Sequence, residues 1–124
     1  MIAHITASHF QLSIPNIRKN KLELFDFHCI EWHWHREFEF LYVESGEVTC
    51  GIGEKQIILS EGEAIFINSK ILHRFYAPSG GIIPNFVCMP EFIAPENSLI
   101  YKKYILPIIS SNIYFQRFQT DELW

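Results

Sequence analysis

The chain has 124 residues and a net charge of −4, and its composition is 48% hydrophobic and 15% aromatic. This length is typical of one domain and too short for two, and the apolar content argues against a disordered chain. Nucleic-acid binding requires Lys and Arg to neutralise phosphates, so the acidic balance argues against an autonomous DNA- or RNA-binding protein. We expect residues 1–124 to form a single domain that does not bind nucleic acid by itself.

The cysteines and the N-terminus indicate the compartment. Cys29, Cys50 and Cys88 form no CxxC motif and are odd in number, which is typical of reduced thiols in the cytosol. Residues 1–6 lack the basic start and apolar core of a signal peptide, and no apolar run reaches transmembrane length. We therefore expect a cytoplasmic protein with no membrane partner.

Short apolar runs separated by turn residues extend from residue 22 to residue 94. The runs are rich in Phe, Ile, Val and Tyr, which favour strands. We expect strands at residues 22–30, 37–43, 47–52, 55–60, 63–67, 71–77 and 82–88. Many short strands with closely spaced turns predict an antiparallel sandwich or barrel over residues 22–94.

The pattern changes after Pro95. Asn97 or Ser98 can cap a helix that begins at Leu99, and we expect a helical segment over residues 97–107. Residues 113–118 are consistent with either a further strand or an extended tail.

A group of histidines and carboxylates begins at His33. If the strand is regular, alternation places His33, His35 and Glu39 on one face, together with Glu37. Closure of the sheet into a barrel would bring the strand that carries His73 against this face. Imidazole and carboxylate groups placed together can chelate Zn, Ni, Mn or Fe. We therefore expect the side chains to converge on one site, with or without a metal.

The orientation of this row has two interpretations. The opposite parity is aromatic and contains Trp32, Trp34, Phe38, Phe40 and Tyr42. These aromatic residues could form the core, which would leave the histidines in solvent. However, Leu41 and Val43 share the parity of the histidines, and a face that changes from polar to apolar suits a barrel interior with a polar site at its mouth. We favour the interior, and the aromatic face then needs a cover from the second sheet, the helical segment or another subunit.

These residues resemble the first motif of the cupin superfamily. That motif has HxH, three or four residues, Glu, six residues and Gly, and it is matched by His33, His35, Glu39 and Gly46. The resemblance implies a mainly β fold, the cupin double-stranded β-helix or jelly-roll barrel, here with a short C-terminal helical segment. It also permits a divalent metal on His33, His35, Glu39 and His73.

The second cupin motif is matched only in part. It has Gly, five residues, Pro, one residue, Gly, two residues, His, three residues and Asn. Gly62 and His73 match, whereas Asn68 replaces the Pro, Lys70 replaces the inner Gly and Ala77 replaces the final Asn.

A narrower resemblance covers residues 22–107. The segments WHWHREFEFLYVESGEV, IILSEGEAIFIN and ILHRF, followed by the helical tail, are similar to the effector-binding domains of AraC-family transcriptional regulators. This implies a domain that binds a small-molecule effector, with a carbohydrate as the leading candidate, and that forms a homodimer through the helix near residues 99–106. The helix-turn-helix DNA-binding domain of such regulators is not present in this chain. The resemblance does not by itself imply a bound metal.

The candidate ligand-binding residues combine the polar row with nearby aromatic rings. They are His33, His35, Glu37, Glu39, His73, Trp32, Trp34, Tyr42 and Tyr76. Each ring could stack on a sugar or belong to the core. We expect no enzyme activity and no catalytic residue. The alternative is a stand-alone metal-binding cupin enzyme, such as a dioxygenase or an isomerase, with Glu37 or His28 as acid or base.

Overall fold

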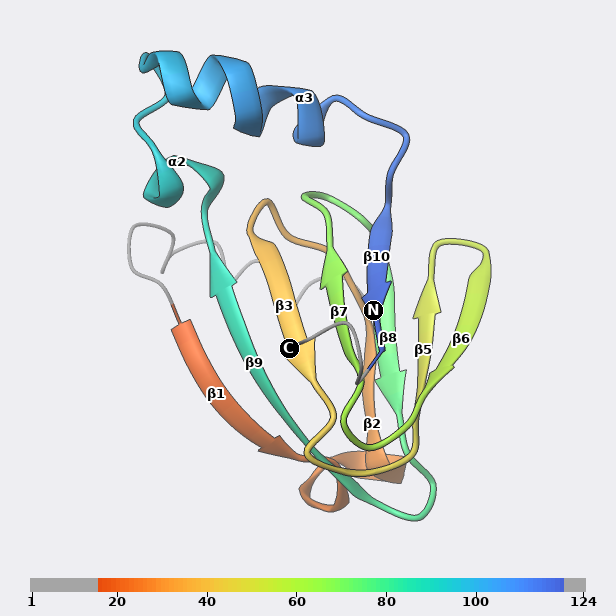
Figure 1. The fold of residues 1–124 in the computed structure, drawn as a ribbon. Coiled ribbons are helices and arrows are strands. Elements are labelled where there is room, and N and C mark those ends of the chain that lie inside the picture. Colours follow the sequence, from red (N-terminus) through yellow and green to blue (C-terminus); the bar gives the residue numbers. More distant parts are fainter. Residues whose placement is uncertain (1–15, 120–124) are drawn as a thin grey trace.

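Two antiparallel β-sheets face each other in the computed structural model, which describes residues 16–119 (Figure 1). The larger sheet has the order β1-β9-β3-β7-β10, with β4 also paired to β9. Its strands are β1 (Asn16–Lys21), β3 (Phe38–Tyr42), β4 (Ser45–Gly46), β7 (Ala64–Ile67), β9 (Gly81–Cys88) and β10 (Phe115–Phe118). The smaller sheet, β2-β8-β5-β6, contains β2 (Cys29–His33), β5 (Val48–Ile52), β6 (Lys55–Leu59) and β8 (His73–Tyr76). The expected mainly β jelly-roll barrel with a short C-terminal helical segment is confirmed.

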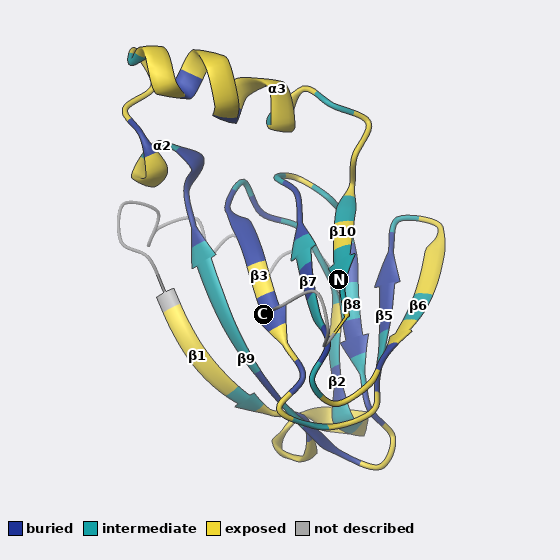
Figure 2. Ribbon diagram, in the orientation of Figure 1, coloured by how far each residue is buried: buried dark blue, intermediate teal, exposed yellow. Residues whose placement is uncertain are grey.

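The core lies between the two sheets. Strand β8 shows the alternation, because His73 and Phe75 are buried inside while Arg74 and Tyr76 face outwards. Buried side chains from both sheets and from the loops between them form one apolar cluster: Leu22, Leu41, Val43, Val48, Cys50, Ile52, Leu59, Ile65, Ile67, Phe75, Ala77 and Ile83. Figure 2 shows the same alternation of buried and exposed positions along the strands.

The prediction of a strand over residues 22–30 is wrong for most of its length. Two 3₁₀ turns, η2 (Leu22–Leu24) and η3 (Asp26–His28), occupy the segment, and β2 begins only at Cys29. The backbone φ angles of Phe27 and His28 are +58° and +53°, which no regular strand allows. The chain here crosses from the edge of the larger sheet to the edge of the smaller one, and Leu22 is fully buried at the crossing.

The other expected strands are all present, and their ends differ from the predicted ones by at most two residues. The structure adds two strands that were not predicted, β1 and the short β4. The alternative left open for residues 113–118 is decided in favour of a strand, since β10 pairs with β7. Within residues 16–119 no helix is long and apolar enough to cross a membrane.

The helical segment closes one end of the barrel. It contains α2 (Pro90–Ile93), the π-helical turn η4 (Tyr101–Ile105) and α3 (Leu106–Ile109). Ser98 caps it as expected, because its Oγ accepts the Tyr101 N–H at 3.2 Å. Pro107 does not end the helix, since it lies in the first turn of α3, where a missing N–H is tolerated. The segment packs on Phe38 and so covers one end of the outer face of the larger sheet.

Candidate metal and ligand site

The structure brings together His33, His35, Glu39 and His73, named the cluster below. One ligand atom from each side chain lies within 4.8 Å of all the others. The predicted reason is wrong, because the first three residues do not share one regular strand. His33 ends β2 in the smaller sheet, His35 lies in the following loop, and Glu39 lies on β3 in the larger sheet. The segment therefore spans both sheets and meets His73, the first residue of β8.

The three imidazoles are held in the same way. Each Nδ1 lies close to a backbone carbonyl oxygen: His33 to Glu31 at 2.7 Å, His73 to Ile71 at 2.7 Å, and His35 to Glu37 at 3.1 Å. A carbonyl only accepts, so each Nδ1 carries the hydrogen. This leaves Nε2 as the nitrogen available to a metal.

Glu39 is the fixed anion of the cluster. Its side chain is buried, and its Oε1 lies 3.1 Å from His35 Nε2 and 3.2 Å from His73 Nε2. Burial opposes ionisation, but hydrogen bonds and charge from the two imidazoles outweigh it and hold the pKa of Glu39 well below its usual 4.5. The carboxylate is therefore ionised at neutral pH.

The pKa values of His35 and His33 move in opposite directions. Burial opposes the charge of His35, but the hydrogen bond to Glu39 and the charges of Glu39 and Glu37 raise its pKa above 6.5. Burial, together with repulsion from His73, lowers the pKa of His33 to about 4. Near neutral pH His33 is therefore in its uncharged form.

The donor set fits a first-row transition metal. Metal–nitrogen and metal–oxygen bonds of about 2.1 Å place neighbouring ligand atoms roughly 3.0–3.4 Å apart. The distances from Glu39 Oε1 to the two nearest imidazole nitrogens lie in this range. Zn, Ni, Mn or Fe would be held by three imidazoles and one carboxylate, and those ligand atoms that lie up to 4.8 Å apart would move closer together around the ion.

Sequence reasoning missed Asn85 and Asn20. Asn85 Nδ2 donates to Glu39 Oε2 at 3.0 Å, and Asn20 Nδ2 donates to Asn85 Oδ1 at 3.3 Å. Asn85 shares the parity of Ile83 and Val87 on β9. An amide between two apolar residues in such a row was the signal that could have revealed it.

Three inward-facing residues near the cluster are only partly buried. Val87 is the direct neighbour of Glu39 across the sheet and shares its face, yet it is only partly buried. Asn85 and His33 are also partly exposed. Of the cluster itself, His33 is partly exposed, whereas His35, Glu39 and His73 are buried.

Glu37 and His28 lie outside the cluster. Glu37 is buried on the far side of the His35 ring, with Oε1 3.7 Å from Nδ1, and among the described residues this oxygen has no hydrogen-bond partner. His28 is hydrogen-bonded to the Pro78 carbonyl, beyond the end of β8 opposite to His73.

Trp32 and Tyr76 do not face the cluster. They lie on the outer side of the smaller sheet, where the Arg74 guanidinium is 5.6 Å from the Trp32 ring centre and 5.7 Å from that of Tyr76. The Trp32 ring covers Gly51 so closely that a Cβ there would lie 2.6 Å from it. These rings therefore cannot stack on a ligand held by the cluster.

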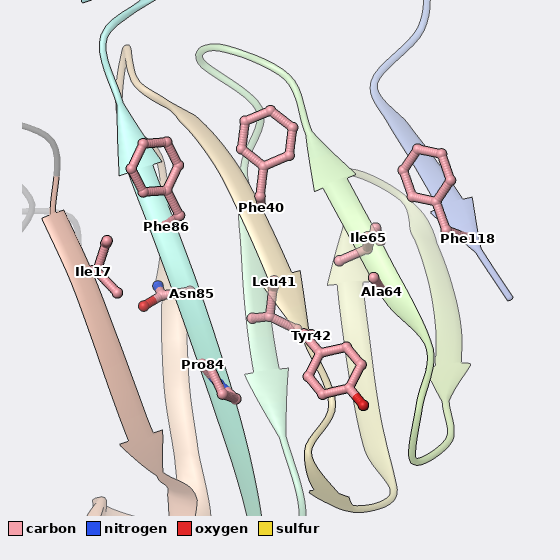
Figure 3. A pocket seen from close by; sticks show the side chains of 10 residues that line it. All are labelled: Ile17, Phe40, Leu41, Tyr42, Ala64, Ile65, Pro84, Asn85, Phe86 and Phe118. Carbon is pink, nitrogen blue, oxygen red and sulfur yellow. The ribbon is translucent and has the colours of Figure 1, made fainter. Parts of the chain in front are cut away.

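Tyr42 lies on the outer face of the larger sheet, and Trp34 lies partly buried in the loop before His35. Tyr42 borders an apolar groove of about 590 Å³, shown in Figure 3. The residues lining the groove are Ile17, Phe40, Leu41, Tyr42, Ala64, Ile65, Pro84, Asn85, Phe86 and Phe118. Its outward rings belong to a different surface from the cluster inside the barrel.

Known proteins resemble the chain in sequence. The family described as Cupin domain matches residues 29–83, a stretch that contains all four members of the cluster. Residues 29–83, a little under half of the chain, are thus similar to the cupin domain family. A Bacillus subtilis (strain 168) protein described as "Uncharacterized HTH-type transcriptional regulator YdeC" is 28% identical over 99 residues. The match covers 77% of this chain and 33% of the relative, so the chain spans about a third of that protein's length.

Solved structures resemble parts of the chain. An RmlC-like cupin from Shewanella frigidimarina has a TM-score of 0.47 and 25% identity, over 48% of this chain and 54% of its own. The SPY1581 protein of Streptococcus pyogenes has a TM-score of 0.49 and 24% identity, over 51% of this chain and 55% of its own. A structure described as "Crystal Structure of FeII HppE" has a TM-score of 0.48 and 21% identity, over 59% of this chain and 41% of its own.

Proposed function

We propose that this chain is the small-molecule-sensing and dimerisation domain of an AraC-type transcriptional regulator, and that the cluster is its binding site. The observation that carries the binding role is the shared hydrogen-bonding pattern of the three imidazoles, in which each Nδ1 is held by a backbone carbonyl while the four side chains keep their ligand atoms within 4.8 Å of one another. The regulatory role is supported by the partial similarity to a helix-turn-helix regulator. DNA binding then belongs to a different domain of the full protein, in keeping with the net charge of −4 of this chain.

We propose that the cluster holds a divalent metal, with Zn, Ni, Mn and Fe as candidates. The ion would supply coordination positions for an oxygen-bearing effector beyond the four protein donors. A carbohydrate remains the leading candidate, because its hydroxyl groups are suitable ligands. The effector would arrive on the partly exposed side of the barrel near Val87.

A metal-dependent cupin enzyme is the second candidate. Three imidazoles and one carboxylate suit a catalytic metal as well as they suit the metal of a sensing domain. The two residues expected to act as acid or base give it no support. Glu37 lies behind the His35 ring, and His28 lies at the opposite end of β8 from His73. We therefore favour the sensing domain.

Metal analysis of protein purified without a His tag tests the site. We expect close to one equivalent of a first-row metal in the wild type, much less in His73→Ala, and a wild-type content in the matched control His28→Ala. Thermal-shift assays with sugars and small acids then identify the effector, since a ligand at 100 times its Kd stabilises by about 2.7 kcal/mol. Equal metal content in the His73 and His28 variants would contradict the assignment of the cluster.

A further inference from the structure

The two oxygens of Glu39 have different partners. Oε1 faces the Nε2 atoms of His35 and His73, where the metal would bind. Oε2 accepts the amide hydrogen of Asn85 at 3.0 Å. Oε1 is thus held from β8 and from the loop after β2, whereas Oε2 is held from β9.

Asn85 is itself held in place. It lies on β9, which pairs with β3 on one side and with β1 on the other. Its Oδ1 accepts a hydrogen bond from Asn20 of β1, which fixes the amide with its NH₂ group towards Glu39. A chain of amides therefore connects the buried carboxylate to the edge of the larger sheet.

We propose that Asn85 is a positioning residue that restricts Glu39 to one-oxygen coordination and so keeps a coordination position free for an external ligand. This inference rests on the proposed metal site. A carboxylate binds a metal through one oxygen or through both. Three imidazoles and one oxygen leave two positions of an octahedral ion open, and a second oxygen from Glu39 would take one of them.

The free position would face the partly exposed side of the barrel. Asn85, Val87 and His33 are the inward-facing members of this region that remain partly exposed. The Asn85 amide thus lies between Glu39 and the side from which the ligand would approach. If Oε2 were released from its hydrogen bond to Asn85, it would be able to occupy the position meant for that ligand.

Cobalt(II) and azide provide the test, with the full chain. The visible absorption of bound Co(II) reports its coordination number, and azide serves as the external ligand. In the wild type we expect azide to change the Co(II) spectrum. In Asn85→Leu we expect Co(II) binding to remain within about tenfold, the spectrum before azide to change, and azide affinity to fall at least tenfold.

Three further variants make the outcome specific. Asn85→Ser removes the amide without adding apolar bulk, and it replaces the leucine variant if circular dichroism shows that the latter does not fold. Asn85→Gln keeps an amide donor and should recover part of the azide affinity. Asn112→Leu, at an exposed amide elsewhere, should match the wild type.

The possible failures are distinguishable. If the wild type does not bind Co(II), the proposed metal site is wrong and the role of Asn85 falls with it. If the wild type binds Co(II) and azide, and Asn85→Leu and Asn85→Ser bind azide equally well, only the inference about Asn85 is overturned. Complete loss of Co(II) from folded variants would also overturn it, because Asn85 would then support the site as a whole.

Discussion

Glu39 sets the chemistry of the cluster, because it brings a negative charge into the barrel interior. A buried carboxylate is costly unless it is paired and hydrogen-bonded, and both oxygens of Glu39 meet this condition. Without a metal, its charge favours a proton on His35 and so raises the pKa of that imidazole. A metal would replace that proton, so metal binding should weaken as the pH falls.

His33 should make the metal-free protein sensitive to acid. Its pKa is about 4 in the folded state and near 6.5 when unfolded, so between these values the unfolded chain binds more protons. Stability should therefore fall as the pH drops from 6.5 towards 4, by at most about 3 kcal/mol from this residue. The raised pKa of His35 has the opposite effect on stability: its contribution is present at low pH and is lost as the pH rises above 6.5. Urea unfolding at several pH values should give a shallower slope for His33→Asn than for the wild type, and identical slopes would contradict this origin.

Lys70 occupies the inner glycine position of the second cupin motif and adopts a φ of +66°. This region costs residues with a Cβ about 1–2 kcal/mol, while the flexibility of glycine costs about 0.5–1 kcal/mol. Because the side chain is exposed, we expect Lys70→Gly to leave stability unchanged or raise it by up to about 1 kcal/mol. Lys70→Val should destabilise by about 1–3 kcal/mol, since a β-branched residue suits this region worst. Thermal unfolding measures both, with Lys55→Val on β6 as the control, and a valine variant as stable as the glycine variant would exclude strain at this position.

The sequence predicted the members of the cluster because the two cupin motifs contain them. It could not predict how they meet, because the departure of His35 from the strand depends on the crossing between sheets. Nor could it predict Asn85, whose role depends on the register of β9 against β3.

At the scale of elements, Asn68 connects the barrel to the helical segment. It replaces the proline of the cupin motif directly after β7 and is buried. Its Nδ2 donates to the carbonyls of Ile108 and Ile113, both at 2.8 Å. One amide therefore holds the end of α3 and the entry to β10.

Replacement of Asn68 should loosen the helical segment selectively. Asn68→Leu removes three hydrogen bonds, including the one that Oδ1 accepts from the Ser69 N–H, and leaves two carbonyls without this donor, so we expect a loss of about 2–3 kcal/mol. Amide hydrogen exchange should accelerate in residues 99–113 and remain slow in β5 and β8. Asn112→Leu, an exposed amide in the same connection, serves as the control. Uniform acceleration across the barrel would instead assign Asn68 to global stability.

Most strands were predictable because apolar residues alternate between clear turns, whereas residues 22–28 were not. Their apolar side chains favour a strand, but Leu22 must close the end of the core and the chain must then reach the other sheet. In this segment, the need to close the core and to connect the two sheets overrides the local preference for a strand. The packing of Tyr101 and Ile105, in the π-helical turn, against Phe38 likewise depends on the tertiary structure.

At the scale of the molecule, two of the exposed apolar surfaces within residues 16–119 are candidates for association. One is the outer side of the helical segment, which carries Leu99, Ile100, Tyr104 and Leu106. The other is the groove on the larger sheet around Phe40 and Tyr42 (Figure 3). Because the histidines point into the barrel, the aromatic residues of opposite parity face outwards and need a cover. The helical segment covers the end of this face near Phe38 and leaves Phe40 and Tyr42 exposed. Exposed apolar patches of this kind are typical of interaction surfaces.

We predict that the protein is a homodimer that associates through the helical segment. A stable interface buries about 800 Å² on each partner around an apolar centre, and charges placed at that centre are strongly unfavourable. The double substitution Ile100→Glu with Tyr104→Glu should therefore give a monomer in light scattering at high micromolar concentration. Phe40→Glu with Tyr42→Glu, which places the same charge on the groove, is the matched control and should remain dimeric. If only the second pair dissociates the dimer, the groove is the interface, and a monomeric wild type would rule out self-association of this chain. Metal content measured in both variants separates the loss of the interface from damage to the cluster, because neither pair of side chains contacts it.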